Sequence, residues 1–194
     1  GDLTEFTGSN LTPTVVGSHV VTGNSACDFN QDAEDVYVTV AGQTEIYARV
    51  YVSLDDIPPT DQSYYARIIH FLGNAGADST CRVYFNYLKP VDKYAIRINR
   101  FYPANVATIY NFAWEVGQKY CLEMYFKKHA TEGIYRVWLD GSLVIEETGL
   151  DTSGSFDIDT VRVGSIAIEI ESRLPSNIDC IAIANSGPIG THDN

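Results

Sequence analysis

The chain has 194 residues and a formal net charge of −12, from 13 Lys and Arg against 25 Asp and Glu. This length favours one domain, and a hydrophobic content of 45% excludes a disordered chain. The acidic balance disfavours nucleic acid and anionic membranes as partners, because both carry negative charge. No stretch approaches the roughly 20 apolar residues that a membrane helix needs.

Alternation of apolar and polar residues with period two recurs along the chain and predicts short strands. A Gly/Asn/Asp-rich loop is expected at Gly73–Thr80, an irregular stretch at Tyr102–Tyr110 and a two-residue hairpin at Asp140-Gly141. We therefore predict an all-β fold, a single antiparallel two-sheet sandwich of the jelly-roll type over residues 1–194. The expected strands are Glu45–Val52, Tyr65–Leu72, Cys81–Leu88, Tyr94–Phe101, Lys119–Lys127, Ile134–Leu139, Leu143–Glu147, Thr160–Ser165 and Ile178–Ala184.

Four segments resemble those of a known family in order and spacing. They are Asp2–Gly8 (DLTEFTG), Tyr135–Leu150 (YRVWLDGSLVIEETGL), Ile158–Ser165 (IDTVRVGS) and Ile178–Gly190 (IDCIAIANSGPIG). Together they resemble the concanavalin A-like, or laminin-G-like, jelly-roll domains over nearly the whole chain. The resemblance implies the fold more than the function, because this fold hosts lectins, carbohydrate-binding modules, glycanases, lyases and structural domains.

The strand pattern also predicts a polar, aromatic sheet face that suits a glycan. Aromatic rings stack on the CH faces of sugars, amide and guanidinium groups bond vicinal hydroxyls, and Arg also suits a uronate. An ordinary exposed sheet is the alternative, since Tyr and Arg are common cross-strand partners. Strict alternation places Arg67 and His70 on opposite faces of their strand, so they are not expected to share this surface. The candidate glycan-binding residues are Tyr47, Arg49, Tyr51, Arg82, Tyr84, Asn86 and Arg97.

The resemblance further implies a structural Ca²⁺ that pins the N-terminal segment to the last strand. Asp2 and Asp179 would supply carboxylates, and the turn at Asn24 and Ala26 would supply carbonyl oxygens. A structural aspartate that caps a turn is the alternative for Asp179. A second acidic cluster does not have the spacing of an EF-hand loop and is expected to be solvated loop charge; it comprises Asp28, Asp32, Glu34 and Asp35.

The sequence gives little support for a catalytic or redox function. No paired-carboxylate run, Gly-x-Ser-x-Gly elbow or Cys-x-x-Cys pair is present, so an enzyme is not favoured. For a polysaccharide lyase, His70, Arg97 and Tyr84 would be the candidates. The four cysteines allow two disulfides or four buried thiols; they are Cys27, Cys81, Cys121 and Cys180.

The sequence thus predicts a non-catalytic, lectin-like module that binds a polysaccharide or glycan and holds a structural Ca²⁺. It would be extracellular or lie on a cell or virion surface. One alternative is a structural subunit of a virion or extracellular filament, in which the end segments join neighbouring modules or copies. The third hypothesis is a polysaccharide lyase.

Overall fold

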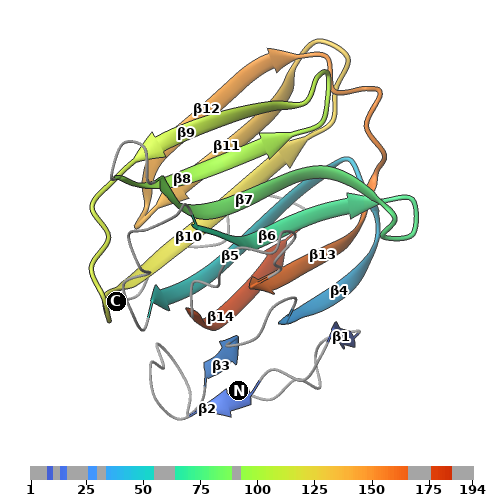
Figure 1. The fold of residues 1–194 in the computed structure, drawn as a ribbon. Helices are drawn as coiled ribbons and strands as arrows, with labels where there is room; N and C mark the ends of the chain where they lie inside the picture. Colours follow the sequence, from blue (N-terminus) through green and yellow to red (C-terminus); the bar gives the residue numbers. More distant parts are fainter. Residues whose placement is uncertain are drawn as a thin grey trace.

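Two antiparallel sheets stack face to face in a β-sandwich (Figure 1). The computed structural model describes residues 8–10, 14–16, 26–29, 34–54, 64–88, 93–165 and 176–184. Sheet A has the strand order β1 (Gly8–Asn10), β4 (Glu34–Gln43), β13 (Ile158–Ser165), β6 (Tyr64–Gly73), β7 (Asp78–Leu88), β8 (Lys93–Arg100) and β9 (Val106–Asn111). Sheet B has the order β12 (Ser142–Leu150), β11 (Gly133–Leu139), β10 (Lys119–Lys127), β5 (Glu45–Leu54), β14 (Ser176–Ala184), β3 (Ala26–Phe29) and β2 (Thr14–Val16).

The predicted all-β sandwich is confirmed, and each expected strand is present within a few residues of its predicted ends. The described residues contain no helix long and apolar enough to cross a membrane. Three local predictions need correction. Residues 34–43 form the unpredicted strand β4, the irregular stretch contains β9, and the expected loop after β6 is a short turn because β7 already begins at Asp78.

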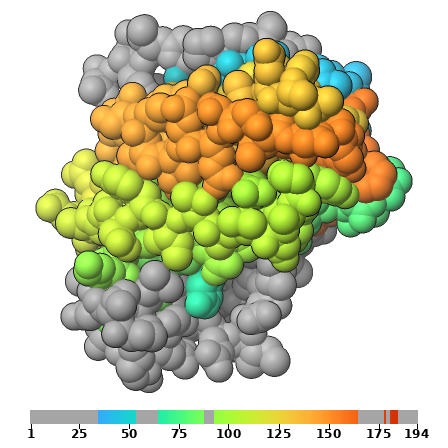
Figure 2. Space-filling view, turned by 90° about the horizontal axis from the view of Figure 1, so that it is seen from above, coloured from blue at the N-terminus to red at the C-terminus, as the bar shows by residue number. Residues whose placement is uncertain are grey.

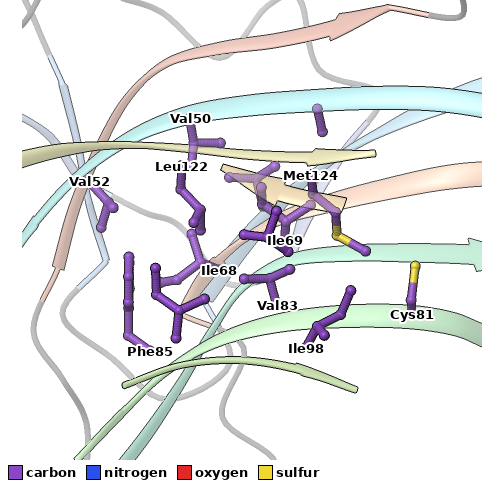
Figure 3. Close-up of a cluster of buried hydrophobic side chains, with 14 of the residues drawn as sticks. Val50, Val52, Ile68, Ile69, Cys81, Val83, Phe85, Ile98, Leu122 and Met124 are labelled. Carbon is purple, nitrogen blue, oxygen red and sulfur yellow. The ribbon is translucent and has the colours of Figure 1, made fainter. Parts of the chain in front are cut away.

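The core lies between the sheets and is built by period-two alternation. On β5, Ile46, Ala48, Val50 and Val52 are all buried, as the sequence predicted. Figure 3 shows Val50, Val52, Leu122 and Met124 of sheet B meeting the inward side chains of sheet A, which include Val83, Phe85 and Ile98. Alternation then turns the polar residues of these strands to the two outer faces of the sandwich.

A β-bulge in β6 breaks the alternation at one point. Arg67 pairs with Tyr84, but Ile69 already pairs with Val83, so β6 carries one extra residue there. Ile68 and Ile69 are consequently both buried in the core, where Figure 3 shows them together. The bulge restores the outward direction at His70. Arg67 and His70 therefore share the outer face of sheet A, and their predicted separation is wrong.

The two sheets are tied at the edge where β9 and β12 run next to each other, which Figure 2 shows as adjacent yellow-green and orange strips. Glu147 on β12 accepts hydrogen bonds from Arg100 on β8 and from Thr108 on β9. The hydroxyl of Tyr135 donates to the Tyr102 carbonyl, 3.1 Å away, across the same edge. This edge fixes sheet A relative to sheet B.

The cysteines and one acidic residue bear on two further expectations. Cys81 and Cys121 are free, buried thiols, whereas the side chains of Cys27 and Cys180 lie outside the described part of the structure. Asp35 is not solvated loop charge, because it is fully buried on β4 and pairs with Arg162 at 3.5 Å. Asp32 and the side chains of Asp28 and Glu34 lie outside the described residues.

Candidate functional site

The structure divides the seven candidate glycan-binding residues between the two outer faces of the sandwich. Tyr47, Arg49 and Tyr51 lie on β5 in sheet B, where β5 pairs with β10 and β14. The other four lie on the adjacent strands β7 and β8 of sheet A, namely Arg82, Tyr84, Asn86 and Arg97. The expectation of one continuous surface is therefore wrong, since β5 is not a neighbour of β7 or β8.

On sheet A the strand register aligns the polar side chains in three rows that run across the strands. The first row joins Arg162, His70, Arg82 and Asn99, the second joins Arg67, Tyr84 and Arg97, and the third contains Asn86. Neighbouring strands lie about 4.8 Å apart, so each row brings side chains from adjacent strands into contact. We call this set of eight residues the arginine face.

Aromatic rings hold the four guanidinium groups of the arginine face. The guanidinium carbons of Arg67 and Arg97 each lie 5.9 Å from the ring centroid of Tyr84. Arg82 lies 4.7 Å from the ring of Phe101, and Arg162 lies 5.6 Å from the ring of Tyr37. A cation stacked on a ring is oriented without losing its N–H donors to the ring. Some of these donors are used within the sheet: Arg67 bonds His70, Arg82 bonds Ser79 and Tyr84, and Arg97 bonds Asn99. The N–H groups that make no such bond among the described residues can donate to an anionic ligand.

The eight residues of the arginine face include no carboxylate, whereas Arg49 and Arg136 of sheet B pair with carboxylates. Arg49 donates two hydrogen bonds to Oε1 of Glu123, at 2.9 and 2.7 Å, and Arg136 donates to Glu146 at 2.7 Å. On the arginine face only Arg162 pairs with a described carboxylate, that of Asp35. Arg67, Arg82 and Arg97 form no salt bridge with any acidic residue in the described ranges. Among the described residues, no carboxylate thus neutralises these three guanidinium groups, in a chain of net charge −12.

Several polar groups of the arginine face are buried without a hydrogen-bond partner. Asn86 is 1% exposed, and neither its Oδ1 nor its Nδ2 is bonded to another group. Nε of Arg67 and Nε of Arg162 are likewise unpaired. A buried unsatisfied group costs about 1–3 kcal/mol, and such groups are rare in folded proteins. Four such atoms lie on the arginine face, two of them in Asn86.

Tyr47 and Arg49 of sheet B are instead engaged within the protein. Tyr47 stacks on Tyr125 with ring centroids 4.2 Å apart, and the Tyr125 hydroxyl donates to Glu45 at 2.9 Å. Burial raises the pKa of Tyr125, and the bonded Glu45 carboxylate raises it further. Arg49 is committed to Glu123, so these side chains stabilise the sheet rather than offer free donors.

The predicted calcium ligands lie partly within the described residues. Ala26 is on β3 and Asp179 on β14, and these strands are adjacent, with Ile178 opposite Cys27. The next residues along the two strands are Asp179 and Ala26, so the backbone brings this half of the predicted site together. Asp2 and Asn24 lie outside the described residues. No cluster of three or more His, Cys, Asp or Glu occurs among the residues that are described.

Sequence reasoning missed Arg162, Arg67 and His70 as members of the arginine face. Arg162 alternates regularly with the buried Val161 and Val163, so the pattern contained its orientation but not which strands would lie beside it. For Arg67 and His70 the missing information was the bulge. The consecutive isoleucines Ile68 and Ile69 are its signal, since two adjacent apolar residues do not fit strict alternation.

Comparison with known proteins identifies the fold. No protein-family model and no curated protein matches the chain. Among solved structures, the chain is similar to an endo-β-1,4-glucuronan lyase from the fungus Trichoderma reesei, with 16% identity and a TM-score of 0.66 over 96% of this chain and 93% of that one. It is also similar to the cellulose-induced protein Cip1, with 15% identity and a TM-score of 0.62 over 90% of this chain and 86% of that one. The alginate lyase Aly36B is similar as well, with 10% identity and a TM-score of 0.57 over 84% of this chain and 80% of that one. The chain therefore shares a jelly-roll β-sandwich with these proteins, which fits the concanavalin A-like fold that the sequence resemblance implies.

Proposed function

We propose that the chain binds an anionic polysaccharide, rich in uronic acids, on the arginine face of sheet A. One observation carries this proposal. Four guanidinium groups gather on one face of an acidic protein, and three of them form no salt bridge with any described carboxylate. Carboxylates are the natural partners of such donors, because an Arg–carboxylate pair makes two parallel, charge-assisted hydrogen bonds.

The remaining residues of the arginine face suit the rest of a sugar chain. Asn86 offers an unpaired amide donor and acceptor, which matches a hydroxyl or a carboxylate oxygen. Ile109 of β9 lies opposite Arg97 and is 46% exposed, so it adds apolar surface for a sugar ring at the edge of the face. The names of two structural neighbours support a uronate, since glucuronan and alginate are both polymers of uronic acids. One structure of Aly36B, a double mutant, is a complex with an alginate trisaccharide.

Paired arginine variants test the proposal. Arg97→Gln removes one free guanidinium from the arginine face, and Arg136→Gln removes one from sheet B, where it already pairs with Glu146. A charge-assisted hydrogen bond contributes about 1.5–3 kcal/mol, so Arg97→Gln should weaken binding of β-1,4-glucuronan oligosaccharides by about 10- to 100-fold in calorimetry. Arg136→Gln should leave the affinity within about twofold. Equal effects of the two substitutions would contradict the assignment.

A second candidate function is β-elimination of the same ligand, and the position of Tyr84 between Arg67 and Arg97 favours it. In this reaction a base removes the proton at C5 of a uronate, a C4–C5 double bond forms, and the C4–O bond breaks as the leaving oxygen takes up a proton. Arg67 and Arg97 would neutralise the carboxylate, and the Tyr84 side chain lies between them on the same face. The ultraviolet absorbance of the unsaturated product, followed in wild type and Tyr84→Phe, tests it. If the wild-type protein forms no product, the elimination function is refuted and only the binding function remains.

A structural Ca²⁺ and an extracellular location belong to the same proposal. The adjacency of Ala26 and Asp179 on β3 and β14 supports the ion, because a carbonyl and a carboxylate oxygen are ligands that Ca²⁺ accepts. A melting temperature that rises with Ca²⁺ and falls with EDTA would support it. Unchanged melting in both would count against it, while glycan affinity measured in EDTA shows whether the ion also serves the binding face.

A further inference from the structure

His70 lies among the cations of the arginine face, and both of its ring nitrogens are occupied. Nη1 of Arg67 lies 3.3 Å from Nδ1 of His70, and the Ser79 hydroxyl lies 2.9 Å from Nε2. Nε of Arg82 lies 3.2 Å from the same Nε2 and also 3.2 Å from the Ser79 oxygen. The ring itself is buried.

Donor and acceptor chemistry indicates that this ring is neutral. A guanidinium only donates, and one guanidinium faces each ring nitrogen, Arg67 at Nδ1 and Arg82 at Nε2. An imidazolium has no acceptor for either of them, whereas a neutral imidazole has one. With its proton on Nε2 the ring accepts from Arg67 and donates to Ser79, and with its proton on Nδ1 it accepts from Arg82. Arg82 bonds to the same Ser79 oxygen, so Ser79 links the imidazole to a second guanidinium.

We infer that His70 is a neutral positioning residue, which holds Arg67 at Nδ1 and Arg82 at Nε2, directly and through Ser79, in the orientation that receives an anionic ligand. The inference rests on the proposed function for the identity of the ligand, and on the hydrogen-bond geometry for the role of His70. Protonation of both ring nitrogens would remove every acceptor for the two guanidinium groups and place another positive charge beside them. His70 is accordingly not the proton carrier of an elimination reaction. That role, where it exists, falls to Tyr84.

The charges around His70 agree with a ring that stays neutral. Arg67 lies on its own strand, Arg82 and Tyr84 on β7, and Arg162 on β13. The one carboxylate nearby among the described residues is Asp35 on β4, which is bonded to Arg162. Burial lowers the pKa of His70 well below its usual value, and Arg67, Arg82 and Arg162 lower it further.

Nitrogen NMR of the histidine side chains tests the neutral state without any ligand. The His70 signals are identified by their loss in His70→Asn. The expected spectrum has one acceptor-type and one protonated ring nitrogen, both unchanged from about pH 8 to about pH 5, where an ordinary histidine titrates. Titration of His70 in this range, or protonation of both ring nitrogens, would overturn the inference even if the protein binds glucuronan.

Two substitutions test the positioning role. His70→Asn keeps an acceptor oxygen near the Nδ1 position, and His70→Ala removes it. Binding of β-1,4-glucuronan oligosaccharides should stay within about threefold for His70→Asn and fall at least tenfold for His70→Ala, with melting temperatures showing that both variants fold. The slowly exchanging Arg67 side-chain N–H signal should persist in His70→Asn and be lost in His70→Ala. Wild-type protein that binds no glucuronan would refute the proposed function, while the NMR signals would still decide the role of His70.

Discussion

Asn86→Leu should make the fold more stable while it weakens the ligand site. Asn86 is 1% exposed on the central strand β7, and both polar atoms of its amide are unpaired. Each unpaired buried group costs about 1–3 kcal/mol, and Leu has a similar volume with no polar atom to satisfy. Allowing for imperfect packing of the new side chain, the free energy of unfolding should rise by about 1–3 kcal/mol. For a chain of this size that is a rise of roughly 2–10 °C in melting temperature.

Urea unfolding and thermal melting measure the change, and Asn111→Leu is the matched control. Asn111 lies in the same cross-strand row, on the edge strand β9, but its side chain is exposed. Substitution there should change stability by no more than about 0.5 kcal/mol. The affinity for a uronate oligosaccharide should fall with Asn86→Leu and stay unchanged with Asn111→Leu. A marked loss of stability in Asn86→Leu would refute the reasoning, because it would show that the amide is already satisfied in the fold.

Three further predictions follow from buried groups. Glu123→Ala should lower the free energy of unfolding by about 3–5 kcal/mol in urea, because it removes the carboxylate that the buried guanidinium of Arg49 bonds at 2.7 Å; a loss below about 1 kcal/mol would contradict this. The free energy of unfolding should fall as the pH drops below about 6.5, because the unfolded chain then binds a proton at His70 that the folded protein does not. Melting temperatures measured across pH should therefore depend less on pH in His70→Asn than in wild type. Cys81 and Cys121 should resist iodoacetamide at about pH 8 until the protein unfolds, because the thiolate is the nucleophile and burial raises the pKa of both thiols, that of Cys121 to about 12. Rapid labelling of the folded protein, detected by mass spectrometry, would contradict this prediction.

The fold was largely predictable because alternation is a local property. The inward series on β5 and the alternation of Val83 and Phe85 with Arg82 and Tyr84 follow directly from period two. The hairpin at Asp140-Gly141 was also readable, and both residues have positive φ there, at 49° and 76°. These features require no knowledge of which strands are neighbours.

The site was only half predictable, because its assembly depends on strand order and on one bulge. β5 carries a Tyr-Arg-Tyr pattern much like that of the arginine face, but it lies in the other sheet, where Glu123 neutralises Arg49. Whether an arginine finds a carboxylate is a property of the cross-strand register, which the sequence does not show. The shared face of Arg67 and His70 likewise depends on the extra residue in β6. The structural-subunit alternative and the calcium ion stay predictions.

The most direct measurement compares the affinity of the wild-type protein for two oligosaccharides of equal length. One is a β-1,4-linked oligoglucuronate and the other is the matching cello-oligosaccharide, which differs only by a hydroxymethyl group in place of each carboxylate. Because three guanidinium groups of the arginine face form no salt bridge with a described carboxylate, the oligoglucuronate should bind at least tenfold more tightly, and its advantage should shrink as salt screens the charges. Equal affinity for the two, or tighter binding of the neutral sugar, would contradict the account.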